Sequence, residues 1–461
     1  MKNSKKISIG VAVVVGLLLI VPFLIPMQTY LQKAEALASQ RLGVPVVIDS
    51  AHLFLFPSPR VALNDIAIGK HQELKVEKLV VVPTISSLLS ANKTLDLNIS
   101  KPVINKAALD IVSALLIKKT DTEPTSVHVR HVKIDEMRLV WPDAKYPVMN
   151  AEATLTGAYN LESATLKTVD GKLEAHLTPK VTPKASPNGD EQLIIVKANK
   201  WTMPVGLPLL MDTAKLEMHL KDNKLEIPNI DIALYGGKLT GDAVLSWPES
   251  GGVRSWRING KLAVANLSAT HPSRLVSKSV YLSGHLFSNG NFSAKAKQLS
   301  QLADNLRGNF KFKVNNGVLH GLDLVKVASL LLKQSQSGGA TQFDEFSGLL
   351  NVTGGNAGKQ YHLRYLKISS GLLAATGQVK VKPNKQLDGV IAVEVKRSVG
   401  LAAIPLNVSG TVNKPVVLPS KAALLGAAAG TAILGPGVGT SLGIKAAGAL
   451  DKVKGLFGGD K

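Results

Sequence analysis

Residues 439–443 (GTSLG) match the G-x-S-x-G pattern that carries the nucleophilic serine of many hydrolases. In those enzymes a core strand precedes the serine, and a histidine later in the chain acts as the general base. The last histidine of this sequence, His362, comes before the pattern. The match therefore reflects an Ala/Gly-rich segment and does not have the order of a catalytic site.

His128 and His131 form the one close pair among ten histidines. Residues three apart in a strand point to opposite faces, and no cysteine, third histidine or set of carboxylates accompanies this pair. We therefore expect surface histidines on a basic strand and no metal site.

The acidic residues are scattered, about one per expected strand or turn, as at Asp143, Glu152, Glu162 and Asp170. The two carboxylates of a glycosidase need only meet in space, so the sequence leaves a hydrolase open. Such an enzyme would need a pocket that gathers two acids, or an acid and His362.

Other catalytic and nucleotide-binding motifs are missing from the sequence. It contains no H-E-x-x-H, no phosphate loop ending in Gly-Lys-Ser/Thr, and no G-x-G-x-x-G between a strand and a helix. Aromatic residues make up 5% of the chain and do not alternate with basic ones, which argues against a base-stacking platform. We expect a protein that is not an enzyme and uses no cofactor or metal.

The composition favours anionic partners. The 461 residues include 54 Lys and Arg against 33 Asp and Glu, a formal net charge of +21. For an exported chain the anionic partners are lipid surfaces and not nucleic acid, although a basic surface that serves only solubility is an open alternative. The absence of cysteine excludes disulfides, thiolate nucleophiles and cysteine-ligated metals.

Residues 7–26 (ISIGVAVVVGLLLIVPFLIP) contain no charge and, as a helix, would reach roughly 30 Å, the thickness of a bilayer core. Lys2, Lys5 and Lys6 precede this segment, and the first basic residue after it is Lys33. This excess of positive charge before the apolar segment predicts a single-pass anchor with a cytoplasmic N-terminus and an exported body. The alternative is a cleaved secretory signal that ends at residues 36–38 (ALA).

After this segment the pattern predicts a short helix and then many strands. Residues 27–42 are rich in helix formers and are followed by Gly43. From Val44 onward, short β-branched runs alternate apolar and polar residues, which is typical of antiparallel sheets with one wet face. A second helix is expected at residues 322–336.

We predict a mainly β fold, in which a transmembrane helix is followed by an extended antiparallel sheet with a few short helices. The family resemblance described below implies that this sheet is curled into a repeating β-groove. Five parts follow: residues 1–26, cytoplasmic tip and anchor; 27–118, stalk helix and first groove unit; 119–190, middle β region with a polar loop; 191–415, second groove; 416–461, an Ala/Gly-rich helical tail. The tail either lies on a membrane or the sheet as short helices or forms a second span.

Several segments resemble the AsmA-like family of bacterial envelope proteins. They are residues 41–48 (RLGVPVVI), 55–69 (LFPSPRVALNDIAIG), 79–89 followed by 101–104, 305–310 (NLRGNF), 316–324 (NGVLHGLDL) and 405–415 (PLNVSGTVNKP). The resemblance extends over nearly the whole chain and is weakest at residues 118–190.

The resemblance implies a Gram-negative inner-membrane anchor and a periplasmic body of β-groove units, akin to chorein-type bridge-like lipid-transfer proteins. The implied activity is movement of phospholipid between the inner and outer membranes, or other support of outer-membrane assembly. The implied partners are phospholipids, the inner membrane and outer-membrane assembly proteins; the family brings no enzymatic residues.

An apolar trough would lower the cost of carrying an acyl chain through water. We predict that its lining includes one face of several late strands, namely Phe310, Phe312, Val314, Val379, Val381, Ile391, Val393 and Val395. The alternative is that these residues form the dry core of a β-sandwich, in a scaffold that recruits assembly partners and carries no lipid.

Overall fold

The computed structural model describes residues 27–111, 127–141, 144–156, 161–179, 191–204, 208–250, 253–330, 338–355, 357–396 and 403–425. The predicted anchor at residues 7–26 and the tail from residue 426 onward, including residues 439–443, lie outside these ranges. None of the helices within them is long and apolar enough to cross a membrane.

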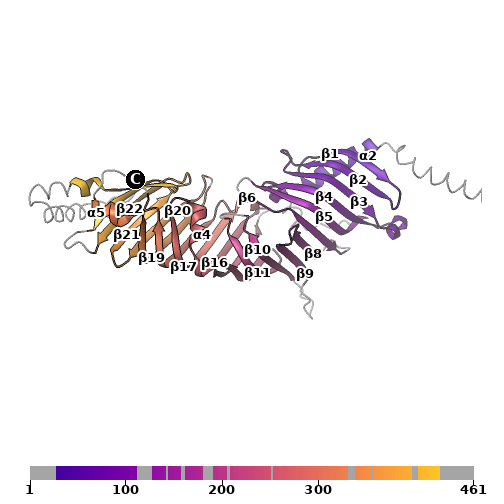
Figure 1. Cartoon of the computed structure of the whole chain (residues 1–461). Helices are drawn as coiled ribbons and strands as arrows, with labels where there is room; N and C mark the ends of the chain where they lie inside the picture. Colours follow the sequence, from indigo (N-terminus) through magenta and orange to yellow (C-terminus); the bar gives the residue numbers. More distant parts are fainter. Residues whose placement is uncertain are drawn as a thin grey trace, which may run out of the picture. The chain divides into compact units, whose positions relative to one another are not determined.

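The predicted mainly β class is confirmed (Figure 1). The described helical elements are short: α2 (Met27–Leu42), η1 (Ile85–Leu89), α4 (Thr270–Val276), η2 (Leu299–Gln301) and α5 (Leu324–Leu330). The described residues divide into two compact units, drawn from Met1–Gly206, Lys215–Asp222 and Gln298–Ser300 for unit 1, and from Leu207–Ala214, Asn223–Lys297 and Gln301–Lys461 for unit 2. The five parts expected from the sequence stay a prediction.

Unit 1 contains β1 (Val46–Phe54), β2 (Arg60–Ile68), β3 (Leu74–Pro83), β4 (Lys93–Asn105), β5 (Val127–Trp141), β6 (Ala144–Lys145), β7 (Met149–Leu155), β8 (Leu161–Thr168), β9 (Leu173–Pro179) and β10 (Gln192–Thr202). Strands β1 to β4 form an antiparallel meander, and β5, β7, β8, β9 and β10 form another. The residues of β11 (Leu210–Lys221) are shared between the two units.

The prediction of a purely antiparallel sheet is wrong at one place, because β4 and β5 run parallel. Parallel neighbours need a crossover of a dozen or more residues, and residues 106–126 between these strands are long enough to supply it. The alternating pattern of each strand reports which face is wet but not the direction of its neighbour.

The predicted helix at residues 27–42 is confirmed as α2, and it lies against the sheet instead of standing free as a stalk. Leu31, Ala38 and Leu42 pack on a core that includes Val46 and Ile48 of β1. Two polar groups of α2 fix the contact: Ser39 Oγ accepts a hydrogen bond from Val46 N (2.9 Å), and Glu35 Oε1 accepts one from Ile48 N (2.6 Å).

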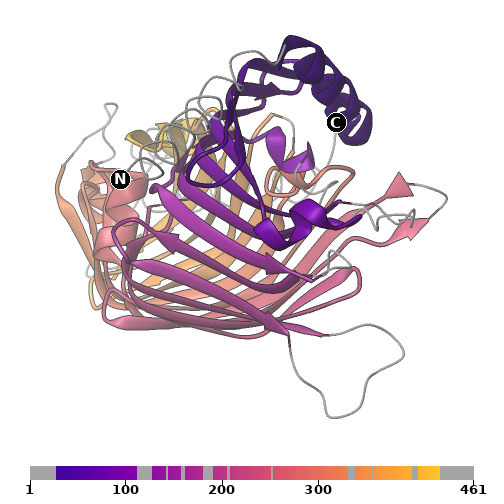
Figure 2. The same ribbon diagram turned by 90° about the vertical axis from the view of Figure 1, so that its right-hand side faces the viewer.

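Unit 2 contains β12 (Lys224–Leu234), β13 (Gly237–Ser246), β16 (Trp256–Ser268), β17 (Tyr281–Ala296), β18 (Arg307–His320), β19 (Ala340–Thr353), β20 (Gln360–Ser369), β21 (Leu373–Val381), β22 (Leu387–Val395), β23 (Ile404–Thr411) and β24 (Lys414–Pro419). Each of these strands pairs antiparallel with the next. The strands β14 (Glu249–Ser250) and β15 (Val253–Arg254) form a separate small hairpin. Figure 2 shows that the strands of unit 2 are twisted and curled instead of flat.

The second predicted helix, at residues 322–336, is present as α5, and residues 331–337 lie outside the described part. The buried Thr341 fixes its start: Thr341 Oγ1 accepts a hydrogen bond from Leu324 N (2.9 Å) and donates one to the carbonyl of Leu322 (2.8 Å). Through Leu324, Val327 and Ala328, α5 covers part of one face of the unit 2 sheet.

Glycine lets neighbouring strands approach closely on this side of the sheet, also where α5 does not cover it. At Gly290 of β17, a Cβ atom would collide with the backbone carbonyl oxygen of Asn309 on β18, and would lie 2.7 Å from Phe310 Cα and 2.6 Å from Phe310 Cδ1. Backbone cannot move aside as a flexible side chain can, so this position requires glycine.

We predict that Gly290→Ala destabilises unit 2 by about 2 kcal/mol or more, because the methyl group has no space without separating β17 from β18. Chemical denaturation followed by circular dichroism measures this change. Gly371→Ala is the matched control, since a Cβ there meets nothing within 4 Å. Equal midpoints for the two variants would show that the strands are not packed this closely.

Candidate functional site

The eight residues predicted to line a trough all lie on one face of the unit 2 sheet. Phe310 of β18 is paired with Leu350, Leu350 with Leu363, and Leu363 with Val379. Directly paired residues in a sheet point to the same side. The same register places Phe312, Val314, Val381, Ile391, Val393 and Val395 on this side, which we call the apolar face.

Burial divides the eight residues into two groups. Val314, Val393 and Val395 are buried (1%, 0% and 9% exposed) in a core that includes Leu324 and Val327 of α5. The remaining five, Phe310, Phe312, Val379, Val381 and Ile391, are partly exposed. Of these five, Val379 and Ile391 pack against that core, and Phe310, Phe312 and Val381 do not belong to it. The apolar face is therefore sealed at one end of these strands and incompletely covered toward the other.

A series of aromatic rings marks the change from open to sealed. Phe312 contacts Phe346 edge to face with ring centroids 5.4 Å apart, and Phe346 contacts Phe343 at 5.9 Å. Phe343 is buried in the α5-covered core, whereas Phe312 is partly exposed. One apolar surface thus continues from the covered end toward the open end.

Aromatic rings on this face lie across glycines of their own strand or of the neighbouring strand. Atoms of the Phe310 ring occupy the space that a Cβ of Gly290 or Gly308 would need, and the Phe292 ring does so at Gly260. With no side chain beneath them, the rings lie low over the backbone.

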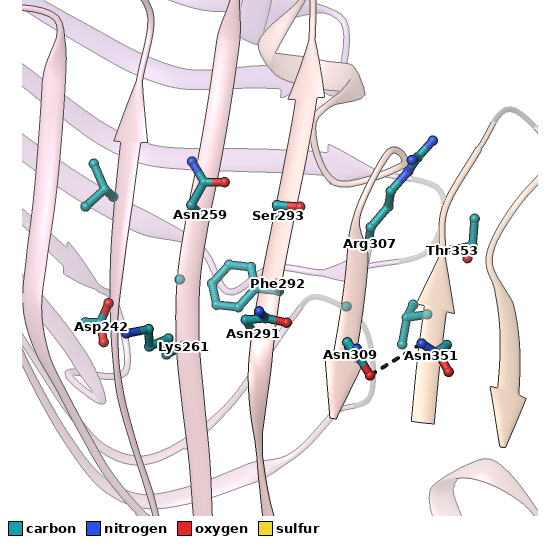
Figure 3. A pocket seen from close by; sticks show the side chains of 14 residues that line it. Asp242, Asn259, Lys261, Asn291, Phe292, Ser293, Arg307, Asn309, Asn351 and Thr353 are labelled. Carbon is teal, nitrogen blue, oxygen red and sulfur yellow. Dashed lines mark hydrogen bonds between the residues drawn. The ribbon is translucent and has the colours of Figure 1, made fainter. Parts of the chain in front are cut away.

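Two hollows, of about 640 and 600 Å³, are lined mainly by residues of the opposite side of the sheet. Their lining includes one row of directly paired polar residues, Asp242, Lys261, Asn291, Asn309 and Asn351, so we call this side the polar face (Figure 3). Asn351 Nδ2 donates a hydrogen bond to Asn309 Oδ1 (3.4 Å). Neither hollow is lined by any of the eight predicted residues. The alternation of the strands predicted a wet face but gave no sign that it would be hollowed.

The two hollows do not assemble the groups that a hydrolase needs. Asp242 is the one acid that lines them, and neither is lined by a histidine. A pair of carboxylates, or a carboxylate with His362, is therefore not gathered in either hollow.

His362 itself lies further along the polar face, paired with Asn351. Partial burial lowers the pKa of His362, and the positive charges of Lys380 and Arg364 lower it further, while the hydrogen bond with Gln378 (3.2 Å) acts in the opposite direction. The lowered pKa favours the neutral form of the His362 imidazole, and its charged neighbours Lys380 and Arg364 are both cationic.

The expectation that His128 and His131 point to opposite faces is wrong. His128 is paired with Thr94 and His131 with Asp96, and these two partners lie two residues apart on one face of β4. An irregularity in the register, at Arg130, adds the extra residue that turns both histidines to the same side. Even so, no three His, Asp or Glu side chains cluster as metal ligands within the described ranges.

We predict that Val393→Asp destabilises unit 2 by roughly 4 kcal/mol or more, because it buries an unpaired carboxylate in the α5-covered core. The matched control is Val390→Asp on the same strand, where the side chain is 47% exposed. Thermal unfolding of both variants measures the difference. A Val393→Asp protein as stable as the control would show that this end of the apolar face is open.

The model of the AsmA family matches residues 142–361, somewhat less than half of the chain. The match includes Phe310, Phe312 and Val314 but ends before Val379, and it does not reach the resembling segments at residues 41–104 and 405–415. No curated protein sequence matches the chain. The match supports the predicted AsmA-like assignment over residues 142–361.

Proposed function

We propose that this chain is a non-enzymatic envelope protein, anchored in the bacterial inner membrane by residues 7–26, with its body in the periplasm. In this proposal the apolar face of unit 2 binds phospholipid acyl chains and conducts them toward the outer membrane. The observation that carries the proposal is the open end of the apolar face, where Phe310, Phe312 and Val381 stay partly exposed outside the α5-covered core.

The energetics favour this use of the face. Exposing an acyl chain of about 16 carbons to water costs on the order of 12 kcal/mol, at about 0.8 kcal/mol per methylene. An acyl chain that lies on Phe310, Phe312 and Val381 removes its own surface and theirs from water together. The head group remains outside the sheet, in water, so no polar group of the lipid has to be buried.

The charge of the protein supports the same class of ligand. With a formal net charge of +21, the chain attracts anionic surfaces, and the anionic surfaces of the envelope are phospholipid and glycolipid membranes. Lys311 and Lys313 lie on β18 between the lining residues and point to the polar face, away from the proposed acyl-chain path.

The second candidate function is a scaffold that recruits envelope-assembly partners and carries no lipid. It is favoured by the sealed end, where Val314, Val393 and Val395 pack only against protein. The two functions differ in what the open end meets: acyl chains in the transporter, and a partner or solvent in the scaffold.

The transporter predicts that Phe310→Asp reduces co-purifying phospholipid by roughly tenfold or more, since a carboxylate against hydrocarbon costs well above the ~1.4 kcal/mol that a factor of ten represents. Mass spectrometry of extracts from the full chain, exchanged into lipid-free detergent, measures phospholipid per protein. The control is Asn309→Asp, the neighbouring residue on the polar face, which should bind lipid as the parent does.

Two outcomes would contradict lipid binding. The parent protein could carry no more than trace phospholipid in repeated preparations, which favours the scaffold. Alternatively, Phe310→Asp and Asn309→Asp could lose lipid equally, which would move the binding surface away from the apolar face.

A further inference from the structure

One end of unit 1 carries large apolar side chains in water. Phe54 is the last residue of β1 and Phe56 lies in the turn to β2; they are 41% and 78% exposed. Ile85, the first residue of η1 after β3, is 72% exposed. Isolated exposed apolar residues are ordinary, but a group at one end of a domain marks an interaction surface.

The register of the sheet brings these residues to the same level. Phe54 is paired with Arg60, so Phe56 lies in the turn that joins them. Val61 is paired with Val81, so the residues that follow Val81 run past this turn to Ile85. Both apolar positions therefore project from the same end of β1, β2 and β3.

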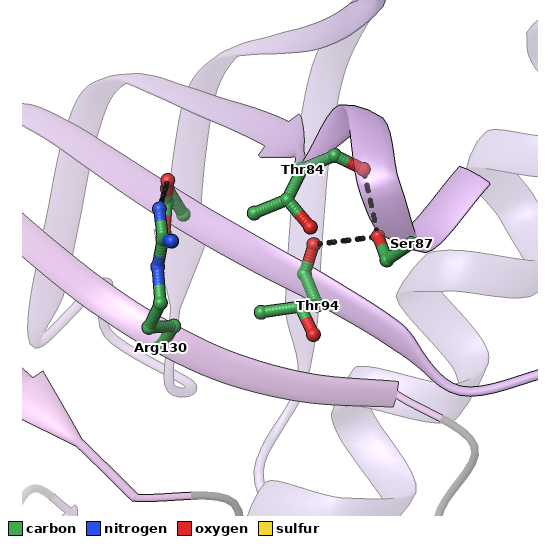
Figure 4. Close-up of polar contacts among 5 residues, drawn as sticks. Thr84, Ser87, Thr94 and Arg130 are labelled. Atoms are coloured by element: carbon green, nitrogen blue, oxygen red, sulfur yellow. Dashed lines mark hydrogen bonds and ion pairs between the residues drawn. The ribbon is translucent and has the colours of Figure 1, made fainter. Parts of the chain in front are cut away.

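Hydrogen bonds fix the short helix η1, which begins at Ile85; Figure 4 shows those of Ser87 with Thr84 and Thr94. The buried Ser87 donates through Oγ to the carbonyls of Thr84 (2.9 Å) and Thr94 (3.3 Å). Thr84 N also donates to the carbonyl of Thr94 (2.9 Å). The short helix is thus fixed to the start of β4, and Ile85 is presented outward by a defined structure.

The start of α2 lies at this same end. Glu35 is hydrogen-bonded to Ile48, and Ser39, four residues later in α2, is hydrogen-bonded to Val46, two residues earlier in β1. The helix α2 therefore runs antiparallel to β1. From Glu35 back to Met27 the helix extends about 12 Å, which matches roughly four strand residues beyond Ile48. Met27 is therefore level with the last residues of β1, and Tyr30 in the first turn of α2 is 61% exposed.

The charges around this end fit an anionic surface. Residues 53–61 and 79–94 contain no Asp or Glu and include Arg60 and Lys93. The guanidinium of Arg60 lies 5.1 Å from the centre of the Phe54 ring. The next acid along β4, Asp96, is neutralised by Arg130, whose Nη2 lies 2.6 Å from Asp96 Oδ2 (Figure 4).

We propose that Tyr30, Phe54, Phe56 and Ile85 form an interfacial tip that enters the head-group region of the membrane. The inference rests on the proposed anchor, because residue 26, where that span ends, directly precedes Met27 at this end of unit 1. Moving Phe and Ile side chains out of water lowers the free energy, and Tyr favours the membrane–water boundary. The tip adds a second contact to the single span and so fixes the tilt of unit 1 on the bilayer.

The absence of cysteine makes a site-specific test direct. Full-length Phe56→Cys and Ile85→Cys proteins are labelled with an environment-sensitive fluorophore and reconstituted into phosphatidylethanolamine–phosphatidylglycerol liposomes. The control is Lys70→Cys, an exposed position just beyond β2, at the opposite end of this strand from Arg60. Nitroxide-labelled lipids then quench any probe that lies in the head-group region.

The proposal predicts that the probes at residues 56 and 85 shift to the blue and lose most of their emission with nitroxide lipid, while the probe at residue 70 changes little. If the protein floats with the liposomes but all three probes behave alike, the tip is overturned and the anchor stands. If the protein does not float with them, the anchor fails, and the tip with it.

Discussion

The apolar face of unit 2 has to be removed from water, and this requirement governs the rest of the structure. Alternation along eleven antiparallel strands places apolar side chains on one side, and α5 covers only part of that side. Residues near α5, such as Val393 and Leu406, are fully buried, whereas Phe310 and Val381 further along the strands are partly exposed. In the proposed function an acyl chain covers this open end without adding a buried polar group.

Unit 1 meets the same requirement differently. There α2 lies on the first strands and completes a core with Ile48, Ile66 and Val76. Among the apolar side chains left in water, Phe56 and Ile85 lie together at one end of the strands. The two proposals thus assign each unit a distinct exposed surface: a strip along the strands of unit 2 for an acyl chain, and a tip of unit 1 for the membrane.

Much of this architecture could be predicted from local pattern. The many helix formers in residues 27–42 predicted α2, and the helical spacing of apolar residues in 322–336 predicted α5. The period-two alternation placed all eight predicted lining residues on one face. The pattern could not show that α5 docks over Val393 and leaves Phe310 open, because that contact joins residues far apart in sequence. It also missed the parallel pairing of β4 with β5 and the irregularity at Arg130, since both depend on how neighbouring strands align.

The central claim is that a lipid tail lies on the open end of the apolar face. Incorporation of a photoreactive amino acid at Val381 or at Lys380, adjacent residues of β21 that point to opposite faces, tests this directly in cells grown with radiolabelled phosphate. The account predicts a phospholipid adduct at residue 381 and none at residue 380. Adducts of equal yield at both positions, or no adduct at residue 381, would contradict it.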